Sequence, residues 1–576
     1  MEIRKHYIGI PVLAAAHLAV TFFTDQRVFA VPASENLTDY IICKGIAFAV
    51  LLAFYYGLYL LLFSGSGTKA PVTGQIEPAS SQAAPGASAD RTAGLSDREQ
   101  ERAETLKEVL LCAAPYLVVV ALVAFFKLRQ GYLSNDELLI YQNAVTLTHY
   151  TWFTYITVYF YIVALMLLPF MYGPIFFKLI IELLVVGYVV MRIRRHYGRV
   201  YGYASYLLFL LYPVLAYTTS AHRLPVYFLV YLYLMTKLLF DHMEKRPVSI
   251  PGLIWILFLS AILTQWRTEG IYFAVLSLIL IFITYPALIR ELRTVEDAGA
   301  GPDGLPVIKP GVSFQKVLLV VLCSLVLQYL VSIPQNGLAW SEMSAKADDR
   351  MKPFYAYTVT NMFRNGLDRE KNQADIEIID RYLSVDMIDA INDYYGDINY
   401  EDVLILYAEG FVGVREEASI EDFFAYADAC KRLFVNNPEV LLKTRWGAFC
   451  YAALPYHVEY TGNSAGALAK TAFSAFKALS YNLLLPVAIL VVLCLYALIR
   501  RRWFLFFSTG GLLAHAFIVF VLAPASYFKY YFPVYIMAYF YVMVEIMELV
   551  YKVNNKRNFG TAQSAARRLT SGVPIK

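Results

Sequence analysis

Charged residues are scarce in this sequence. Asp, Glu, Lys and Arg make up 16% of the 576 residues, whereas soluble domains contain roughly 25%. Hydrophobic residues make up 59% of the chain, and the mean hydropathy is +0.51. This composition excludes a soluble globular protein. The net charge is only +4, and the basic residues cluster beside apolar blocks, which is typical of membrane orientation signals rather than of a nucleic-acid-binding surface.

Cysteine is also scarce. None of the six cysteines forms a CxxC or Cys/His cluster, which argues against a structural zinc site. The apolar segments contain Cys43, Cys112, Cys323 and Cys494, which we interpret as packing residues. Cys430 and Cys450 share the one large polar region, and a disulfide between them stays open as an alternative.

The chain contains a series of long apolar blocks. A helix of about 20 residues crosses a bilayer, and the blocks have about this length. They predict an all-α polytopic membrane protein with about twelve transmembrane helices. The first block has two interpretations, a cleaved signal peptide ending near Ala30 or a first transmembrane helix, and we favour the helix. The predicted spans are 8–23, 40–63, 109–126, 175–191, 200–217, 226–240, 250–264, 271–288, 317–333, 483–499, 503–522 and 531–550.

One further apolar block, Thr151–Tyr172, creates a parity problem. The positive-inside rule places the basic clusters at 98–107 and 192–195 in the cytoplasm. An even number of crossings must therefore separate them, yet three apolar blocks lie between. We expect Thr151–Tyr172 to be an interfacial or re-entrant segment on the outer side. Both termini are then cytoplasmic.

The composition divides the chain into segments. We expect a flexible cytoplasmic linker after the first hairpin, because Ser, Gly, Ala and Pro dominate there. The capping-box pattern at Ser419–Asp422 and the Asn437-Pro438 pair predict helices in a small extracytoplasmic domain. That domain is either an acidic cap without chemistry of its own or an acceptor-recognition surface. The expected segments are a transmembrane hairpin 1–63, the linker 64–106, a transmembrane core 107–333 with an acidic outer loop 128–173, the helical domain 334–480, transmembrane helices 481–551 and a cytoplasmic tail 552–576.

With this topology, polar residues from separate loops emerge on the outer face. Ionisable residues in or near a membrane are costly and indicate function. We select the adjacent acids Asp136 and Glu137 as the central pair, and they are accompanied on that face by His222, Arg223, Arg267, Glu269, Lys529 and Tyr530.

The acid pair has three interpretations. It can supply a general base for an attacking hydroxyl, ligate a divalent cation such as Mg²⁺ or Mn²⁺, or cap a helix, since Ser134 and Glu137 form an S-x-x-E pattern. The cations also have simpler interpretations. Lys529 can extend to the interface, and Arg267 can pair with Glu269. His222 is interpreted as structural.

The order of these features resembles the GT-C superfamily of glycosyltransferases that use polyprenyl- or dolichyl-phosphate sugars, especially its protein mannosyltransferase and aminoarabinose transferase branch. The resemblance covers roughly Leu110–Ile333 and, more weakly, the last three spans. It depends on the acidic motif Asn135-Asp136-Glu137, the turn Arg267-Thr268-Glu269-Gly270 and the late basic aromatic turn around Lys529. The outer domain and the N-terminal hairpin match nothing in that pattern.

The resemblance implies an inverting enzyme of the cell envelope that takes its sugar from a polyprenyl phosphate. Asp136 would be the catalytic base, with Glu137 as a helper or cation ligand. Arg267, Lys529 and Arg223 would bind the donor phosphate, and Glu269, His222 and Tyr530 would support them. The acceptor, a protein, polymer or glycolipid, is left open, and a bacterial plasma membrane is expected. The alternatives are a transporter or flippase of lipid-linked sugars, and a polysaccharide polymerase or ligase.

Overall fold

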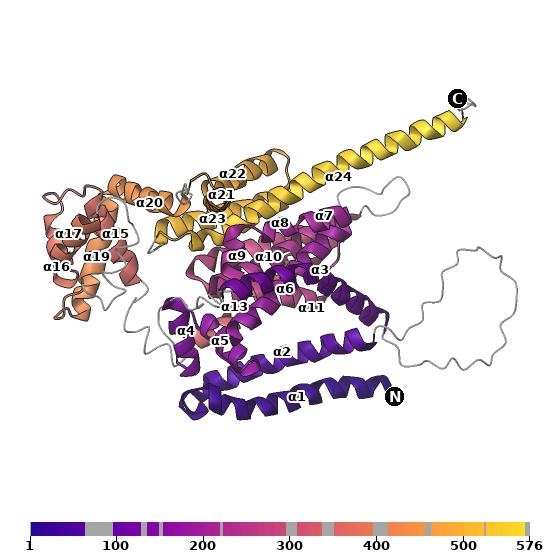
Figure 1. Ribbon diagram of the computed structural model, residues 1–576, viewed down its shortest axis with the longest axis horizontal. Helices are drawn as coiled ribbons and strands as arrows, with labels where there is room; N and C mark the ends of the chain where they lie inside the picture. The colour runs from indigo at the N-terminus through magenta and orange to yellow at the C-terminus, as the bar shows by residue number, and fades with distance from the viewer. Residues whose placement is uncertain are drawn as a thin grey trace. The chain divides into compact units, whose positions relative to one another are not determined.

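The computed structural model describes residues 2–63, 96–127, 135–148, 154–218, 223–294, 308–336, 351–395, 413–454, 462–523 and 526–570. It is an all-α polytopic membrane protein whose described part also contains one short β-hairpin (Figure 1). Within the described residues, eight helices are long and apolar enough to cross a bilayer, and two bent helix pairs raise that number to ten. The twelve predicted spans all fall on mainly helical segments, but the predicted number of crossings is not confirmed.

The chain divides into two compact units, residues 1–148 with 158–191, and residues 149–157 with 192–576. In the first unit, α1 and α2 lie side by side as an antiparallel hairpin (Figure 1). The charged stretch from Asp97 belongs to a helix, so the expected linker ends ten residues earlier than predicted. The helices that begin in the first unit are α1 (Glu2–Val28), η1 (Ala33–Asn36), α2 (Leu37–Phe63), α3 (Asp97–Lys127), α4 (Asn135–Val145) and α6 (Gly173–Tyr197).

The apolar block that posed the parity problem forms α5 (Tyr155–Leu167), a helix of 13 residues. A helix rises 1.5 Å per residue, so α5 is about 20 Å long, less than a hydrocarbon core of about 30 Å. It is one of three shorter apolar helices in the described part of the chain, together with Ile250–Trp266 and Glu269–Thr284. The non-crossing role of this block stays a prediction. The start of α5 belongs to the second unit and the remainder to the first.

The second unit contains the remaining membrane helices. Of the predicted single spans, residues 200–217 are broken into three short helices, and the chain bends by 72° between 199–209 and 212–218. The elements are α7 (Arg199–Ala204), α8 (Tyr206–Phe209), α9 (Tyr212–Thr218), α10 (Arg223–Met243), α11 (Ile250–Trp266), η3 (Thr268–Tyr272), α12 (Phe273–Thr284), η4 (Pro286–Leu288), α13 (Phe314–Asn336), α22 (Leu484–Ile499), α23 (Trp503–Leu522), η7 (Phe528–Tyr531) and α24 (Phe532–Thr570). Strands β1 (Arg290–Thr294) and β2 (Ile308–Val312) pair antiparallel.

The polar region 351–453 forms a small helical domain with its own buried core. The capping box at Ser419 is confirmed, because its hydroxyl accepts from the N–H of Asp422 and the Asp422 carboxylate accepts from the N–H of Ser419. Cys430 is a free thiol buried in this core, and Cys450 is also free, so the two do not pair. The helices are α15 (Met351–Arg364), α16 (Gln373–Tyr382), α17 (Val385–Tyr395), α19 (Ile420–Asn436) and α20 (Pro438–Ala453), followed by α21 (Ala465–Ser480).

A buried arginine attaches this domain to the end of a membrane helix. Arg445 on α20 is 3% exposed and donates to the carbonyl of Ala523, at 2.7 Å, and to the hydroxyl of Thr358. Burial lowers the pKa of Arg445 to about 10. The carbonyl oxygens at the end of a helix carry partial negative charge, so the end of α23 is a favourable place for this cation.

Candidate functional site

The predicted acids form the first turn of α4, and we call Asp136 and Glu137 the acid turn. Carboxylates are favoured there by the unpaired N–H groups and the positive end of the helix dipole. Glu137 is 2% exposed, whereas Asp136 is half-buried. Asp136 is thus the more accessible of the two. Ser134 lies outside the described residues, so the capping-box interpretation is not tested.

A buried charge cluster accompanies the acid turn within the same unit. Lys178 on α6 is fully buried and donates to the carboxylate of Glu182 at 2.9 Å, and Tyr116 donates to the same carboxylate at 3.2 Å. The carboxylate of Glu137 interacts electrostatically with the ammonium group of Lys178. Buried charges are stable only when they are paired. Glu137 is therefore part of a structural charge balance, which separates its role from that of Asp136.

The N-terminal hairpin holds the other end of α4. The N–H of Ala30 donates to the carbonyl of Val145 at 2.8 Å, and the amide of Asn36 donates to the carbonyl of Leu147. Helix C-termini leave carbonyl groups without partners, and these two bonds satisfy groups at and just beyond that end. The hairpin, which has no counterpart in the resemblance, is therefore joined to the helix that carries the acid turn.

The second predicted site begins where α11 ends. Arg267 adopts an extended conformation, and η3 follows at once, so that the N–H of Gly270 donates to the carbonyl of Arg267 at 2.9 Å. A Cβ on Gly270 would lie 2.3 Å from the carbonyl oxygen of Leu263. No side chain fits at that distance, so the glycine permits the sharp reversal. We call residues 267–270 the arginine turn.

Arg267 itself is buried, with 7% of its surface exposed. Its Nε donates to the Glu269 carboxylate at 2.6 Å, and its Nη2 also pairs with that carboxylate. Its Nη1 is buried and has no hydrogen-bond partner among the described residues. Because a guanidinium presents five N–H donors in a fixed fork, Arg267 keeps one edge for a further acceptor.

The predicted basic aromatic turn packs against Arg267 within the same unit. The guanidinium carbon of Arg267 lies 5.4 Å from the ring centre of Tyr530. Lys529, in the same turn, has its ammonium group 4.5 Å from the ring centre of Tyr527 and 5.9 Å from that of Tyr530. We call Phe528–Tyr531 the lysine turn. Two motifs from distant parts of the sequence therefore meet through Tyr530, and the roles expected of Arg267 and Lys529 stay predictions.

Sequence reasoning missed His515 on α23, which is fully buried beside both turns. Its Nε2 lies 3.2 Å from the carbonyl oxygen of Tyr530, which requires a proton on Nε2. Its ring packs edge-on against Tyr272, with 5.6 Å between ring centres. A single histidine within an apolar run was a signal, because ionisable groups in membrane helices are costly.

Two predicted site residues, Arg223 and His222, remain. Arg223 is the first residue of α10, and nothing is described of its side chain. His222 lies outside the described residues. Among the parts of the chain that are described, no three or more His, Cys, Asp or Glu side chains form a group that could hold a metal ion. Asp136 and Glu137 are the only protein donors proposed for a cation, and Glu137 already interacts with Lys178.

Comparison of the chain with family profiles, with curated proteins and with solved structures gives no match.

Proposed function

We propose that this protein is an integral membrane glycosyltransferase that moves a sugar from a polyprenyl-phosphate donor to an acceptor on the extracytoplasmic face, with inversion at the anomeric carbon. The observation that carries the proposal is the free Nη1 edge of the buried Arg267, packed against the lysine turn. A buried guanidinium with an unused edge is suited to bind a phosphate oxygen, and a nearby ammonium group adds a point charge.

The proposed reaction is a direct displacement. The carboxylate of Asp136 takes the proton from an acceptor hydroxyl, whose oxygen forms a bond to the anomeric carbon. The bond between that carbon and the phosphate oxygen breaks, and the polyprenyl phosphate leaves with its electron pair. Arg267 and Lys529 stabilise the negative charge that develops on the phosphate.

The test is transfer of radiolabelled sugar from a panel of polyprenyl-phosphate sugars by the purified full-length protein. We expect transfer or donor hydrolysis by the wild type and a loss of at least about 100-fold in Asp136→Asn, since general bases contribute about 10² to 10⁴-fold. Asp428→Asn is the matched control, because Asp428 is exposed and pairs only with Lys431 on the polar domain. Equal turnover by wild type and Asp136→Asn would remove Asp136 from the mechanism.

A transporter or flippase of lipid-linked sugars is the second candidate, and specific observations favour it. Two helix pairs are bent, by 72° and 41°, and Glu182 is buried within α6. Broken helices and intramembrane acids are frequent in transporters. The test follows a labelled lipid-linked sugar across the membrane of vesicles that contain the protein. Movement of the lipid without sugar transfer would favour this candidate, if that movement is retained in Asp136→Asn and lost in Glu182→Gln.

A further inference from the structure

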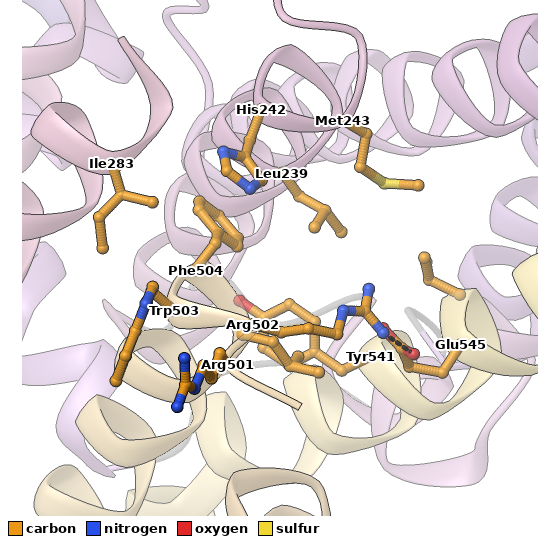
Figure 2. A pocket seen from close by; sticks show the side chains of 12 residues that line it. Leu239, His242, Met243, Ile283, Arg501, Arg502, Trp503, Phe504, Tyr541 and Glu545 are labelled. Atoms are coloured by element: carbon orange, nitrogen blue, oxygen red, sulfur yellow. Dashed lines mark hydrogen bonds and ion pairs between the residues drawn. The ribbon is translucent and has the colours of Figure 1, made fainter. Parts of the chain in front are cut away.

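A cavity lies in the second unit, lined by residues other than those of the arginine and lysine turns. It has a volume of about 310 Å³ and is lined by residues of α10, α12, α23 and α24 together with the Arg501–Arg502 connection (Figure 2). We call it the arginine pocket. Its walls are mostly apolar and are formed by Leu239, Met243, Ile283, Leu505 and Val544. A cavity of this size, apolar with a few polar groups, is typical of a small-ligand site.

The polar groups of the pocket gather where α23 begins. Figure 2 shows the imidazole of His242 stacked on the ring of Phe504, with 5.2 Å between ring centres, and the ion pair of Arg502 with Glu545. Arg502 also lies 3.6 Å from the carboxylate of Glu548. Two carboxylates therefore balance the charge of Arg502.

Arg501 is different. No described residue forms a hydrogen bond or ion pair with its side chain. Its φ is +55°, in the left-handed region, directly after α22. The N–H of Arg502 donates to the carbonyl of Ala497 at 2.8 Å, which is the bond that closes a helix at this position. Glycine is the usual residue there, because a Cβ is strained at positive φ. An arginine at such a position keeps a cation at the pocket despite the strain.

The start of α23 adds donors for an anion. Arg502 occupies the N-cap position and provides no side-chain acceptor for the first turn of the helix. The residues of that turn, Trp503, Phe504 and Leu505, are among the lining residues. Unpaired N–H groups at a helix N-terminus favour a bound anion. Together with Arg501, they give the pocket an anionic preference.

We propose that the arginine pocket binds the phosphate of an anionic phospholipid, with part of its apolar body against the wall of Leu239, Met243 and Val544. The apolar wall favours a lipid over a free phosphate. The basic run Arg500–Arg502 is expected on the cytoplasmic side, where anionic lipid headgroups attract such clusters. Trp503, 47% exposed at the same place, is the residue type that lies at headgroup level.

The test uses the full-length protein in neutral detergent, titrated with short-chain phosphatidylglycerol and followed by native mass spectrometry of the first bound lipid. Arg501→Gly removes the charge and suits the backbone, so loss of folding is not expected. We expect its affinity to fall about ten-fold, the effect of one charge-assisted hydrogen bond. Lys245→Gly is the matched control, because Lys245 is also exposed, basic and at φ +53°, after α10, but does not line the pocket. We expect it to bind as the wild type does.

A second variant, Val544→Trp, fills the pocket without changing charge and is expected to weaken the same binding. Equal affinity in Arg501→Gly and wild type, or equal affinity for phosphatidylcholine, would overturn the proposal. Displacement of the lipid by millimolar inorganic phosphate, with no loss in Val544→Trp, would also overturn it and identify a free-phosphate site instead.

Discussion

Two arginine sites in the second unit are built from the same residue types but differ in charge balance. Each has an arginine, a glutamate partner, a histidine and a tyrosine. They are Arg267 with Glu269, His515 and Tyr530, and Arg502 with Glu545, His242 and Tyr541. The same helix contributes to both: from Phe504 to His515, α23 rises about 16 Å.

The difference lies in burial and in the number of carboxylates. Arg267 is buried, contacts one carboxylate and keeps a free Nη1 edge. The side chain of Arg502 is 32% exposed and contacts two carboxylates. A guanidinium with two acid partners stabilises the fold, whereas one with a single partner and no access to water retains a donor for a ligand. Burial and partner number, rather than residue type, therefore separate a structural arginine from a ligand-binding one.

The largest expected effect is on stability. Glu269→Ala leaves the buried Arg267 without a carboxylate, and loss of one partner of a buried pair costs about 3–5 kcal/mol. Glu545→Ala is the control, because Arg502 keeps Glu548 and solvent access, and we expect a loss below about 1 kcal/mol. Thermal unfolding in detergent, followed by size-exclusion chromatography, measures both. Equal losses in the two variants would contradict the distinction.

The next effect is on catalysis. Arg267→Lys keeps the charge but loses the planar fork, so we expect sugar transfer to fall about 10² to 10³-fold, as on removal of a preorganised donor. Arg502→Lys should transfer sugar at the wild-type rate, since its guanidinium has structural partners only. Initial rates with a saturating polyprenyl-phosphate sugar provide the measurement. Full activity in Arg267→Lys would show that charge alone is needed.

A smaller effect is expected from the backbone of the arginine turn. In Gly270→Ala the new Cβ meets the carbonyl of Leu263 at 2.3 Å, so the turn must shift. Overpacking of this kind costs about 1–3 kcal/mol. Gly510→Ala on α23 is the control, because no atom lies within 4 Å of its Cβ. The measurement is the melting temperature of each variant. A Gly270→Ala melting curve equal to that of the wild type would contradict the close approach of Gly270 to the Leu263 carbonyl.

The smallest effect should come from Lys529. Its ammonium group lies over Tyr527 and is half-buried, so water screens it more than it screens Arg267. We expect Lys529→Gln to raise the KM for the lipid donor about ten-fold, with little change in kcat, as for loss of one charge-assisted contact. Titration of donor concentration at fixed acceptor tests this. An unchanged KM would assign Lys529 to the interface alone.

Much of the membrane architecture could be predicted from sequence, because long apolar runs between basic clusters have few structural solutions in a bilayer. The break within 200–217 was not predicted. That run is mostly apolar, but Pro213 stands just after the bend and was a signal, because proline disfavours the helical conformation in the residue before it. The pairing of β1 with β2 was also missed.

The candidate sites were predicted in part. The acid turn and the two basic turns stood out because each interrupts an apolar context, and Arg267 does meet Tyr530. The interaction of Glu137 with Lys178 was not foreseen, because it depends on the packing of α4 and α6. The free edge of Arg267 is likewise invisible in the sequence, where Arg267 and Glu269 read as a simple ion pair. Whether a donor remains unused depends on which groups surround it in the folded protein.

The continuity of α24 sets a limit on how this chain can vary. The helix begins at Phe532, directly after the lysine turn, and carries Tyr541 and Glu545 of the arginine pocket. One extra residue between Phe532 and Tyr541 would turn everything beyond it by about 100° and advance it by about 1.5 Å. Glu545 would then leave the side of the helix that meets Arg502. The number of residues in this segment is therefore fixed by the phase of a single helix.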